Sequence, residues 1–200
     1  MDTPAHGHPP AHDLAHAPAH GGHNLTGFVI FLCSESLIFL AFFAAYITYR
    51  VSAPVWRPAG VEGLEVREPL LYTLILVSSS LVIWLAERAL QRGRLGAFRG
   101  WWLLTMVMGS IFVFGQAQEW AKLPFGPQSG VFGASFYLLT GFHGLHVITG
   151  ILLMGLMLVR SFQPGNYDNG EAGVVSVSLF WHFVDVIWIL LFLLLYAWQR

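Results

Sequence analysis

The sequence predicts an all-α integral membrane bundle of five transmembrane helices. Of its 200 residues, 56% are hydrophobic and 10% are charged, whereas a soluble domain carries about 25% charged residues. Five apolar stretches are each long enough to cross a hydrocarbon core of about 30 Å, which takes about 20 helical residues. They are continuously apolar rather than alternating, and an open sheet cannot satisfy its backbone hydrogen bonds in lipid. Helices are therefore expected, and strands are not.

The N-terminal segment, residues 1–23, is a tail rich in histidine, proline, alanine and glycine, and it precedes a membrane domain at 24–200. Its prolines disfavour a continuous helix, and it has no apolar cluster that could form a core. Imidazole suits zinc, copper and nickel, so a metal site and a solvated, pH-sensitive tail are both open interpretations. Six of the nine histidines lie in this tail: His6, His8, His12, His16, His20 and His23.

The membrane domain divides into helices separated by segments that contain prolines, glycines and charges. The predicted helices span residues 25–49, 70–90, 101–121, 131–159 and 174–198. The first apolar stretch is too long for the core of a signal peptide, so we expect it to be a retained helix. Five tryptophans fall near predicted helix ends, as an aromatic belt at the membrane surface requires: Trp56, Trp101, Trp102, Trp120 and Trp198.

The second connection determines the expected orientation because it is short and basic, with Arg88, Arg92, Arg94 and Arg99. The positive-inside rule places such a loop in the cytoplasm. The N-terminus is then cytoplasmic and the C-terminus lies on the other side. The net charge of −1 does not bear on nucleic-acid binding, and because the sequence shows no basic patch we expect no nucleic-acid partner.

Glu35 lies near the middle of the first predicted helix, where an ionisable side chain costs at least about 2.5 kcal/mol. The residues four positions away, Phe31 and Phe39, cannot pair with it. Its partner must therefore come from another helix, a partner subunit, a lipid head group or water. A carboxyl bonded between helices, a lipid- or proton-related group and a metal ligand are the alternatives. Glu119 is a further candidate, nearer a helix end.

His143 and His146 are three residues apart in the fourth predicted helix, which predicts that they share one helix face. Gly141 and Gly144 beside them would permit close approach of another helix. One interpretation is a haem or metal site completed by His182. The other is hydrogen bonding between helices.

His182 and Asp185 form a second pair with a spacing of three residues, in the last predicted helix. Asp185 can accept a hydrogen bond from a ring nitrogen of His182 and so select its tautomer. Such a pair is cheaper to bury than either residue alone. Trp181 and Trp188 flank the pair and are candidates for helix or subunit packing. A structural pair and a contact with lipid or another subunit are the two interpretations.

These motifs resemble the haem–copper oxidase subunit III family. The segment from Gly141 to Val147 (GFHGLHV) and the segment from Trp181 to Trp188 (WHFVDVIW) are similar to two motifs of that family. Ser34-Glu35 followed by phenylalanines is similar to its glutamate-bearing helix. The resemblance covers about residues 25–198 and leaves the tail outside. Longer family members have two additional helices before the glutamate-bearing one, so this chain resembles the five-helix bacterial form.

The resemblance implies an accessory subunit III of a proton-pumping, cytochrome c oxidase type terminal oxidase that reduces O2 to water. Haem and copper are expected in partner subunits I and II, with no catalytic residue, metal ligand or cofactor in this chain. Direct binding to subunit I, contacts with subunit II, bound phospholipid and support of sustained proton uptake are implied as well. The residues for a lipid- or proton-related role would be Glu35, Glu119, His143, His146, His182 and Asp185.

Four alternatives remain open from the sequence, and the fourth of them is a small proton-coupled transporter built around Glu35. One is subunit III of a quinol oxidase, and a second is the related protein associated with nitric oxide reductase. The third belongs to a different class, a haem-b membrane anchor that uses His143 or His146 together with His182. In each case the expected location is the bacterial cytoplasmic (inner) membrane, which the chain would cross several times.

Overall fold

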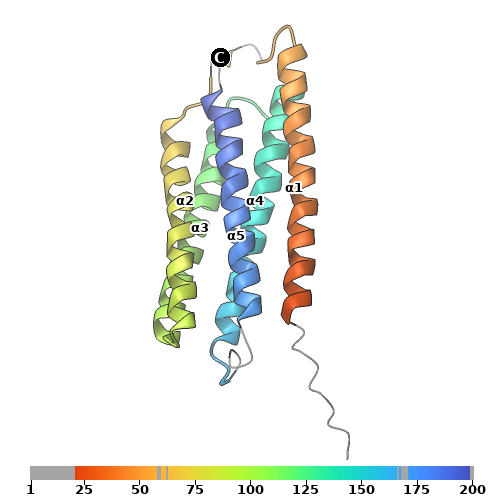
Figure 1. Ribbon diagram of the computed structural model, residues 1–200. Coiled ribbons are helices and arrows are strands. Elements are labelled where there is room, and N and C mark those ends of the chain that lie inside the picture. The colour runs from red at the N-terminus through yellow and green to blue at the C-terminus, as the bar shows by residue number, and fades with distance from the viewer. Residues whose placement is uncertain (1–20, 58–59, 62, 166, 168–170, 199–200) are drawn as a thin grey trace, which may run out of the picture.

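The computed structural model describes residues 21–57, 60–61, 63–165, 167 and 171–198 (Figure 1). Most of the histidine-rich tail, residues 1–20, lies outside the described residues. Five helices are long and apolar enough to cross a membrane, and no strand occurs in the described part of the chain. The all-α fold class is therefore confirmed. The helices are α1 (Gly21–Ser52), α2 (Arg67–Gln91), α3 (Leu95–Lys122), α4 (Gly130–Arg160) and α5 (Ala172–Phe192), followed by a short π-helix η1 (Leu193–Ala197).

The helices extend past the apolar stretches at most of their ends. The third begins at Leu95 instead of residue 101, because Gly96, Ala97 and Phe98 continue the helix outside the apolar stretch. The first begins at Gly21 and so includes the last residues of the predicted tail. At the C-terminus the α-helix ends at Phe192, and one turn of π-helix continues the chain to Ala197. Hydropathy therefore indicates which segments can be in lipid and does not place the first and last helical turns.

Figure 1 shows the arrangement of the five helices. α2 and α3 form an antiparallel hairpin on one side, α4 and α5 lie in the middle, and α1 lies at the opposite edge. α1 packs against α4 and α5, whereas α5 contacts α1, α2 and α4. In the most apolar stretch of each helix, 50% of α5 residues are buried but only 11% of α1 residues are. α5 is therefore the central helix and α1 the peripheral one.

The turn between α2 and α3 is tight and has a specific cause. Gly93 has φ +69°, a left-handed conformation that favours glycine. The amide of Gly93 donates to the Leu90 carbonyl at 2.8 Å, and that of Arg94 donates to the Ala89 carbonyl at 2.9 Å. These two bonds form a Schellman motif, which ends α2 and directs the chain back into α3. Arg92 and Arg94 consequently lie together at one end of the bundle.

The same end of the bundle is held by contacts between α3 and the segment after α4. Arg99 donates to the Ser161 carbonyl at 2.5 Å and to the Ser161 hydroxyl at 3.1 Å. Tyr167 donates to the Met157 carbonyl at 2.7 Å. Partial burial raises the pKa of the Tyr167 hydroxyl, and it likewise raises the pKa of the nearby Glu171 carboxyl. Arg99 is therefore committed to the fold, unlike the arginines of the α2–α3 turn.

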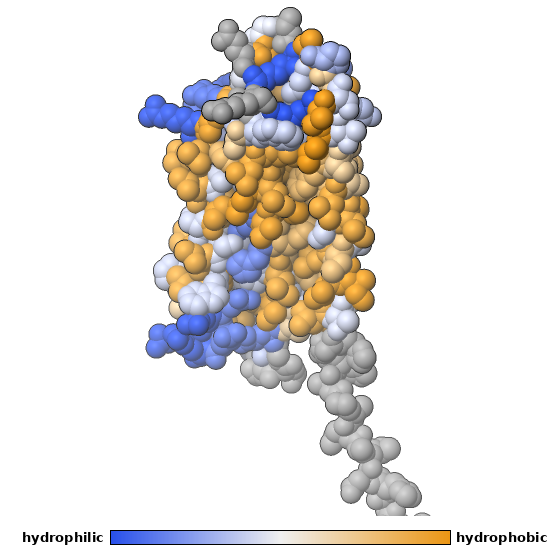
Figure 2. All heavy atoms as spheres, turned by 45° about the horizontal axis from the view of Figure 1, so that its top comes forward, coloured by the Kyte–Doolittle hydropathy of each residue, from blue (hydrophilic) through white to orange (hydrophobic). Residues whose placement is uncertain are grey.

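The outer surface matches a membrane environment. On the face that Figure 2 shows, an apolar belt crosses the middle of the bundle, and hydrophilic side chains gather toward its two ends. Large exposed apolar side chains occur on all five helices, among them Leu37, Leu81, Phe114, Leu152 and Val186. In water these patches would be far larger than a soluble monomer tolerates, whereas in lipid they carry no comparable cost.

Candidate functional site

Glu35 meets its partner on another helix, one of the options that the sequence left open. Its Oε2 lies 3.2 Å from Nε2 of His146 on α4. Both side chains are largely but not fully covered, with 17% of Glu35 and 13% of His146 exposed. Ring contacts surround the pair, with Phe39 and Phe142 centred 5.1 Å and 4.7 Å from the imidazole. A polar contact inside an aromatic shell therefore joins α1 to α4.

The second ring nitrogen of His146 determines where the protons of this pair lie. Nδ1 is 2.8 Å from the carbonyl oxygen of Phe142, which can only accept, so Nδ1 carries a hydrogen. In a neutral imidazole Nε2 is then the acceptor, and the Glu35 carboxyl must donate to it. Otherwise the imidazole is protonated and Glu35 is ionised. In both cases a single proton lies between Nε2 and Oε2 and can be held by either group.

His182 and Asp185 do not bond directly as expected, because Ser80 of α2 lies between them. Nδ1 of His182 is 3.0 Å from the Ser80 hydroxyl oxygen, and that hydroxyl donates to Oδ2 of Asp185. Since the serine hydrogen is used on Asp185, Nδ1 of His182 is the donor to Ser80. The predicted direct pair is therefore wrong in detail. The three residues form a polar bridge from α5 to α2, and the sequence did not single out Ser80 for it.

His143 and His146 point to different neighbours, contrary to the expectation of a shared face. Three residues correspond to 300° of helical rotation, so the two side chains diverge by about 60°. That divergence directs His143 into the core, where its ring lies 4.9 Å from Trp188 and 5.8 Å from Phe112. His143 is 1% exposed, and neither ring nitrogen has a hydrogen-bond partner among the described residues. It is a buried aromatic contact in α4 and has no part in the Glu35 pair.

Trp181 of α5 fills the centre of the bundle. It is completely buried, and its indole nitrogen donates to the Ser79 hydroxyl of α2 at 2.8 Å. Gly109 and Gly150 make room for its ring, because a Cβ atom on either glycine would lie 2.5 Å and 2.8 Å from it. Gly150 permits the close approach of α4 to α5, and Gly109 lets the Trp181 ring reach α3.

Gly144 does not pack against another helix of the described chain, because a Cβ atom there would meet nothing within 4 Å, and its packing against another subunit stays a prediction. Gly141 is closer to the expectation, since a Cβ atom on it would lie 3.3 Å from Trp120. Both glycines line a shallow apolar groove of about 370 Å³ between α3 and α4. The GxxG spacing therefore produces a groove on the surface instead of a helix–helix contact.

Trp188 and Glu119 lie toward the end of the bundle where α2 begins and α3 finishes. Trp188 is buried and donates to the Thr73 hydroxyl at 2.9 Å, which adds a second link between α5 and α2. Glu119 is 7% exposed in the last turn of α3, close to the ion pair of Lys122 with Glu68. It lies near a helix end, as predicted, whereas Glu35 is in the middle of α1.

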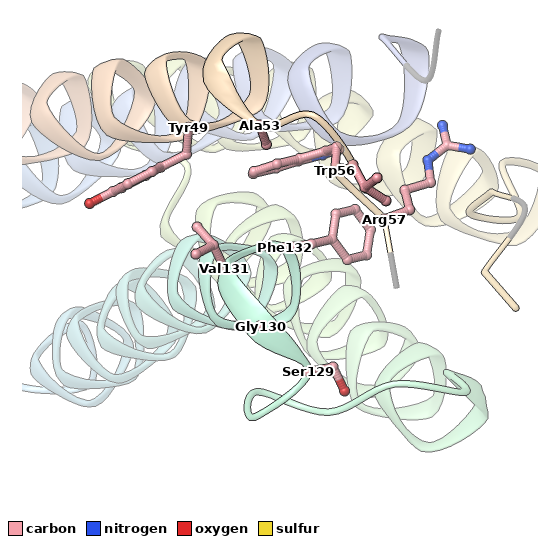
Figure 3. Close-up of a pocket in the computed structure, with 9 residues that line it drawn as sticks. Tyr49, Ala53, Trp56, Arg57, Ser129, Gly130, Val131 and Phe132 are labelled. Carbon is pink, nitrogen blue, oxygen red and sulfur yellow. The ribbon is translucent and has the colours of Figure 1, made fainter. Parts of the chain in front are cut away.

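α1 and α4 separate at the end where α1 finishes, and a cavity of about 250 Å³ opens between them (Figure 3). Figure 3 shows Tyr49 and Trp56 on one side of it and Val131 and Phe132 on the other. The Trp56 ring closes its inner end by packing edge-on against Tyr46 and Phe132. Beyond the Glu35 contact, α1 is thus held mainly by aromatic side chains.

The three histidines of α4 and α5 have different neighbours, which is unfavourable for a shared metal site. Within the described ranges, no group of three or more His, Cys, Asp or Glu residues could hold a metal ion. His143, His146 and His182 approach Trp188, Glu35 and Ser80 respectively. They therefore do not converge on a common position where a haem iron could take two of them as ligands.

Comparison with known proteins agrees with the motifs. A family model described as cytochrome c oxidase subunit III matches residues 12–200, so the match begins within the predicted tail, earlier than expected. A cytochrome c oxidase subunit 3 from Thermostichus vulcanus is 44% identical over 92% of this chain and 92% of its own length. One from Corynebacterium diphtheriae is 37% identical over 85% of each chain. The Rhizopus stolonifer protein of that name is 37% identical, with 86% of this chain matching 63% of the relative.

Proposed function

This chain belongs to the cytochrome c oxidase subunit III family, and we propose that it serves its oxidase without taking part in the redox chemistry. Family membership makes it an accessory subunit of a haem–copper oxidase. In the proposed role, haem and copper belong to subunits I and II. The chain binds subunit I, holds phospholipid and supports proton uptake during turnover.

The observation that carries this proposal is that most ionisable side chains at membrane depth are hydrogen-bonded between helices. Ser80, His182 and Asp185 are committed to one bridge between α2 and α5, and Trp181 and Trp188 add two more bonds between the same helices. These contacts support a structural role. They leave none of these groups arranged around a space where a substrate could react.

The Glu35–His146 pair is different, because it lies at the partly exposed edge of the bundle and shares one proton. A group that can accept or release a proton at the side of an oxidase subunit suits the support of proton uptake. A mechanism follows from the geometry: the proton moves between Oε2 and Nε2, two atoms that lie 3.2 Å apart, as the charges around the pair change. We assign this role to Glu35 and His146, and structural roles to His143, His182 and Asp185.

The haem-anchor alternative is disfavoured by the directions of the three histidines. Both ring nitrogens of His146 already have partners, and His182 uses Nδ1 on Ser80. A haem held by His146 and His182 would have to break a contact of His146, and one held by His143 and His182 would have to open the core where the His143 ring packs against Trp188 and Phe112. The geometry therefore supports the accessory role over cofactor binding.

The proposed location is the bacterial cytoplasmic membrane, with the N-terminus on the cytoplasmic side. The arginines of the α2–α3 turn support this orientation through the positive-inside rule. α1 then begins on the cytoplasmic side, at the same end of the bundle as the α2–α3 turn (Figure 1). Its largely exposed apolar surface is available to lipid and to subunit I.

The test is to tag the chain, purify it from its native membrane in mild detergent and identify the proteins that come with it. We expect subunits I and II of an oxidase to come with it. The complex should show a haem spectrum, and the chain separated from those subunits should show none. A stoichiometric Soret band on the separated chain would contradict the proposal. So would a preparation that lacks a haem–copper subunit.

The role of the pair is tested in the same complex with Glu35→Ala. We expect an unchanged initial rate of O2 consumption and a faster loss of activity during turnover, because the proton-sharing pair is gone. Leu37→Ala is the matched control, since Leu37 is an exposed residue on the same helix. Equal activity lifetimes for the two variants would show that Glu35 does not support proton uptake. That result would not contradict the accessory role of the chain.

A further inference from the structure

A basic groove lies at the end of the bundle where α2 turns into α3. It has a volume of about 180 Å³, and its lining includes Trp84, Arg88, Arg92, Arg94 and Trp101. The three arginines are exposed, and the Schellman turn at Gly93 brings them together from the end of one helix and the start of the next. Figure 2 shows strongly hydrophilic side chains gathered at this end, at the lower left, directly below the apolar belt.

The positive charge of this groove is not neutralised within the described part of the chain. Among those residues, the ion pairs join Lys122 to Glu68 and His146 to Glu35, both elsewhere in the bundle. Glu87 is adjacent to Arg88 in sequence, but it is partly buried on the side of α2 near Ser178 of α5. The three guanidinium groups are therefore available to an anion.

The backbone at the start of α3 adds to the positive electrostatic potential of the groove. α3 begins in the groove after Arg94, which makes no side-chain cap bond, and the first turn has no acidic residue. The free amide groups of a first helical turn carry partial positive charge and bind anions such as phosphate. Arginine presents a planar set of donors that matches phosphate oxygens. The groove thus combines three guanidinium groups with an uncapped helix N-terminus.

The position of the groove identifies the source of the anion. Trp84 and Trp101 border it with 42% and 40% exposure, and exposed tryptophans are typical of the membrane–water interface. The Arg88 guanidinium stacks 3.9 Å from the centre of the Trp84 ring, which holds the charge at that depth. One turn farther into the membrane the surface is apolar, with Leu81 and Leu104 exposed.

We propose that this groove binds the head group of an anionic phospholipid, with the phosphate held by Arg88, Arg92 and Arg94 and the acyl chains lying along α2 and α3. A free phosphate would use the arginines alone, whereas a lipid also uses the tryptophans and the apolar surface beside them. The site is separate from Glu35, which lies on α1 at the other side of the bundle. The inference does not depend on which subunit the chain accompanies.

The test titrates the full chain, purified with the subunits that accompany it, with phosphatidylglycerol and counts bound lipid by native mass spectrometry. Each charge at an anionic membrane surface is worth about 1 kcal/mol, so we expect Arg92→Gln with Arg94→Gln to weaken binding roughly 10- to 30-fold. Arg92→Lys with Arg94→Lys keeps the charge and should lose much less. Arg67→Gln, an exposed arginine at the opposite end of α2, should have no effect.

Two competition arms distinguish the sources of the anion. Phosphatidylcholine with the same acyl chains should bind weakly, and inorganic phosphate should not displace phosphatidylglycerol. Equal binding of phosphatidylcholine, displacement by phosphate, or wild-type affinity in the glutamine double variant would each overturn the proposal. If the double variant instead lost an accompanying subunit while it kept its lipid, the groove would be a protein contact and the lipid site would be refuted.

Discussion

The first and last transmembrane helices are almost equally apolar, yet they are packed very differently. The most apolar stretches of α1 and α5 have mean hydropathies of 2.3 and 2.2, but 11% of the first and 50% of the second are buried. Lipid tails are as apolar as leucine, so hydrophobicity does not drive one helix against another within the membrane. Close packing and hydrogen bonds decide the association, and α5 has more of both.

The contacts of the two helices show this directly. α5 inserts Trp181 into spaces left by Gly109 and Gly150, and it is tied to α2 by Ser79, Ser80 and Thr73. α1 presents a single buried stripe, Phe39, Phe43 and Tyr46, together with the Glu35 contact to His146. Four comparisons between variants test whether this difference sets the stability of the bundle.

The largest effect is expected for Trp181→Ala. The change empties a completely buried position and removes the partner of Ser79, so we expect a loss of about 3–5 kcal/mol in the free energy of unfolding. Denaturation in mixed micelles with increasing sodium dodecyl sulfate measures it. Phe114→Ala is the control, because Phe114 is 64% exposed and its loss should have little effect. A small change at Trp181 would show that α5 is not the centre of stability.

A pair of glycines gives the next largest contrast. At Gly150 an added Cβ would lie 2.8 Å from Trp181, so Gly150→Ala should destabilise the bundle by about 1–3 kcal/mol. At Gly144 the added atom meets open space, so Gly144→Ala should be neutral or stabilising by up to about 1 kcal/mol. Thermal unfolding of the two variants in one detergent gives the comparison. If their order were reversed, the packing of α4 on α5 would have to be revised.

The polar bridge between α2 and α5 should contribute less than the tryptophan contacts. Ser80→Ala removes the hydroxyl that joins His182 to Asp185. Hydrogen bonds between membrane helices are worth about 0.6 kcal/mol on average and up to about 1.7 kcal/mol. Ser78→Ala is the matched control, since the exposed Ser78 bonds the Ile75 carbonyl of its own helix. Equal melting temperatures for these two variants would mean that the bridge contributes nothing to stability.

The smallest effect is expected on α1. Glu35→Gln should change stability by less than about 0.5 kcal/mol and leave assembly intact, because the amide can donate to Nε2 of His146 in place of the carboxyl. Glu35→Leu removes that donor and serves as the comparison, with an expected cost of about 1 kcal/mol. Recovery of the intact complex on a sizing column measures assembly. Loss of the complex with Glu35→Gln would show that the charge itself is structural.

Several parts of the site could be predicted from sequence spacing and several could not. That Glu35 needs a partner beyond its own helix followed from Phe31 and Phe39 at positions four residues away. Which histidine supplies that partner did not follow, because His143 and His146 were equally available. The sequence also did not indicate that Ser80 lies between His182 and Asp185, since a serine in an apolar helix usually bonds its own backbone.

The glycines show the same division. A small residue permits close approach wherever it stands, so Gly141, Gly144 and Gly150 were equivalent as sequence. Only Gly150 lies against a large ring of the neighbouring helix closely enough to exclude a side chain. Gly109, which shares Trp181 with it, had no motif around it, and a search for small residues at the depth of a buried tryptophan could have found it.

The sequence by itself determined that the chain forms five membrane-crossing helices and that it resembles the subunit III family, because hydropathy and local motifs are properties of single segments. The tertiary structure decided which helix is central, which histidine meets Glu35 and which arginines form a groove. Those outcomes depend on the rotation and depth of each helix relative to its neighbours. In lipid that arrangement is set by contacts between helices, and no single segment contains it.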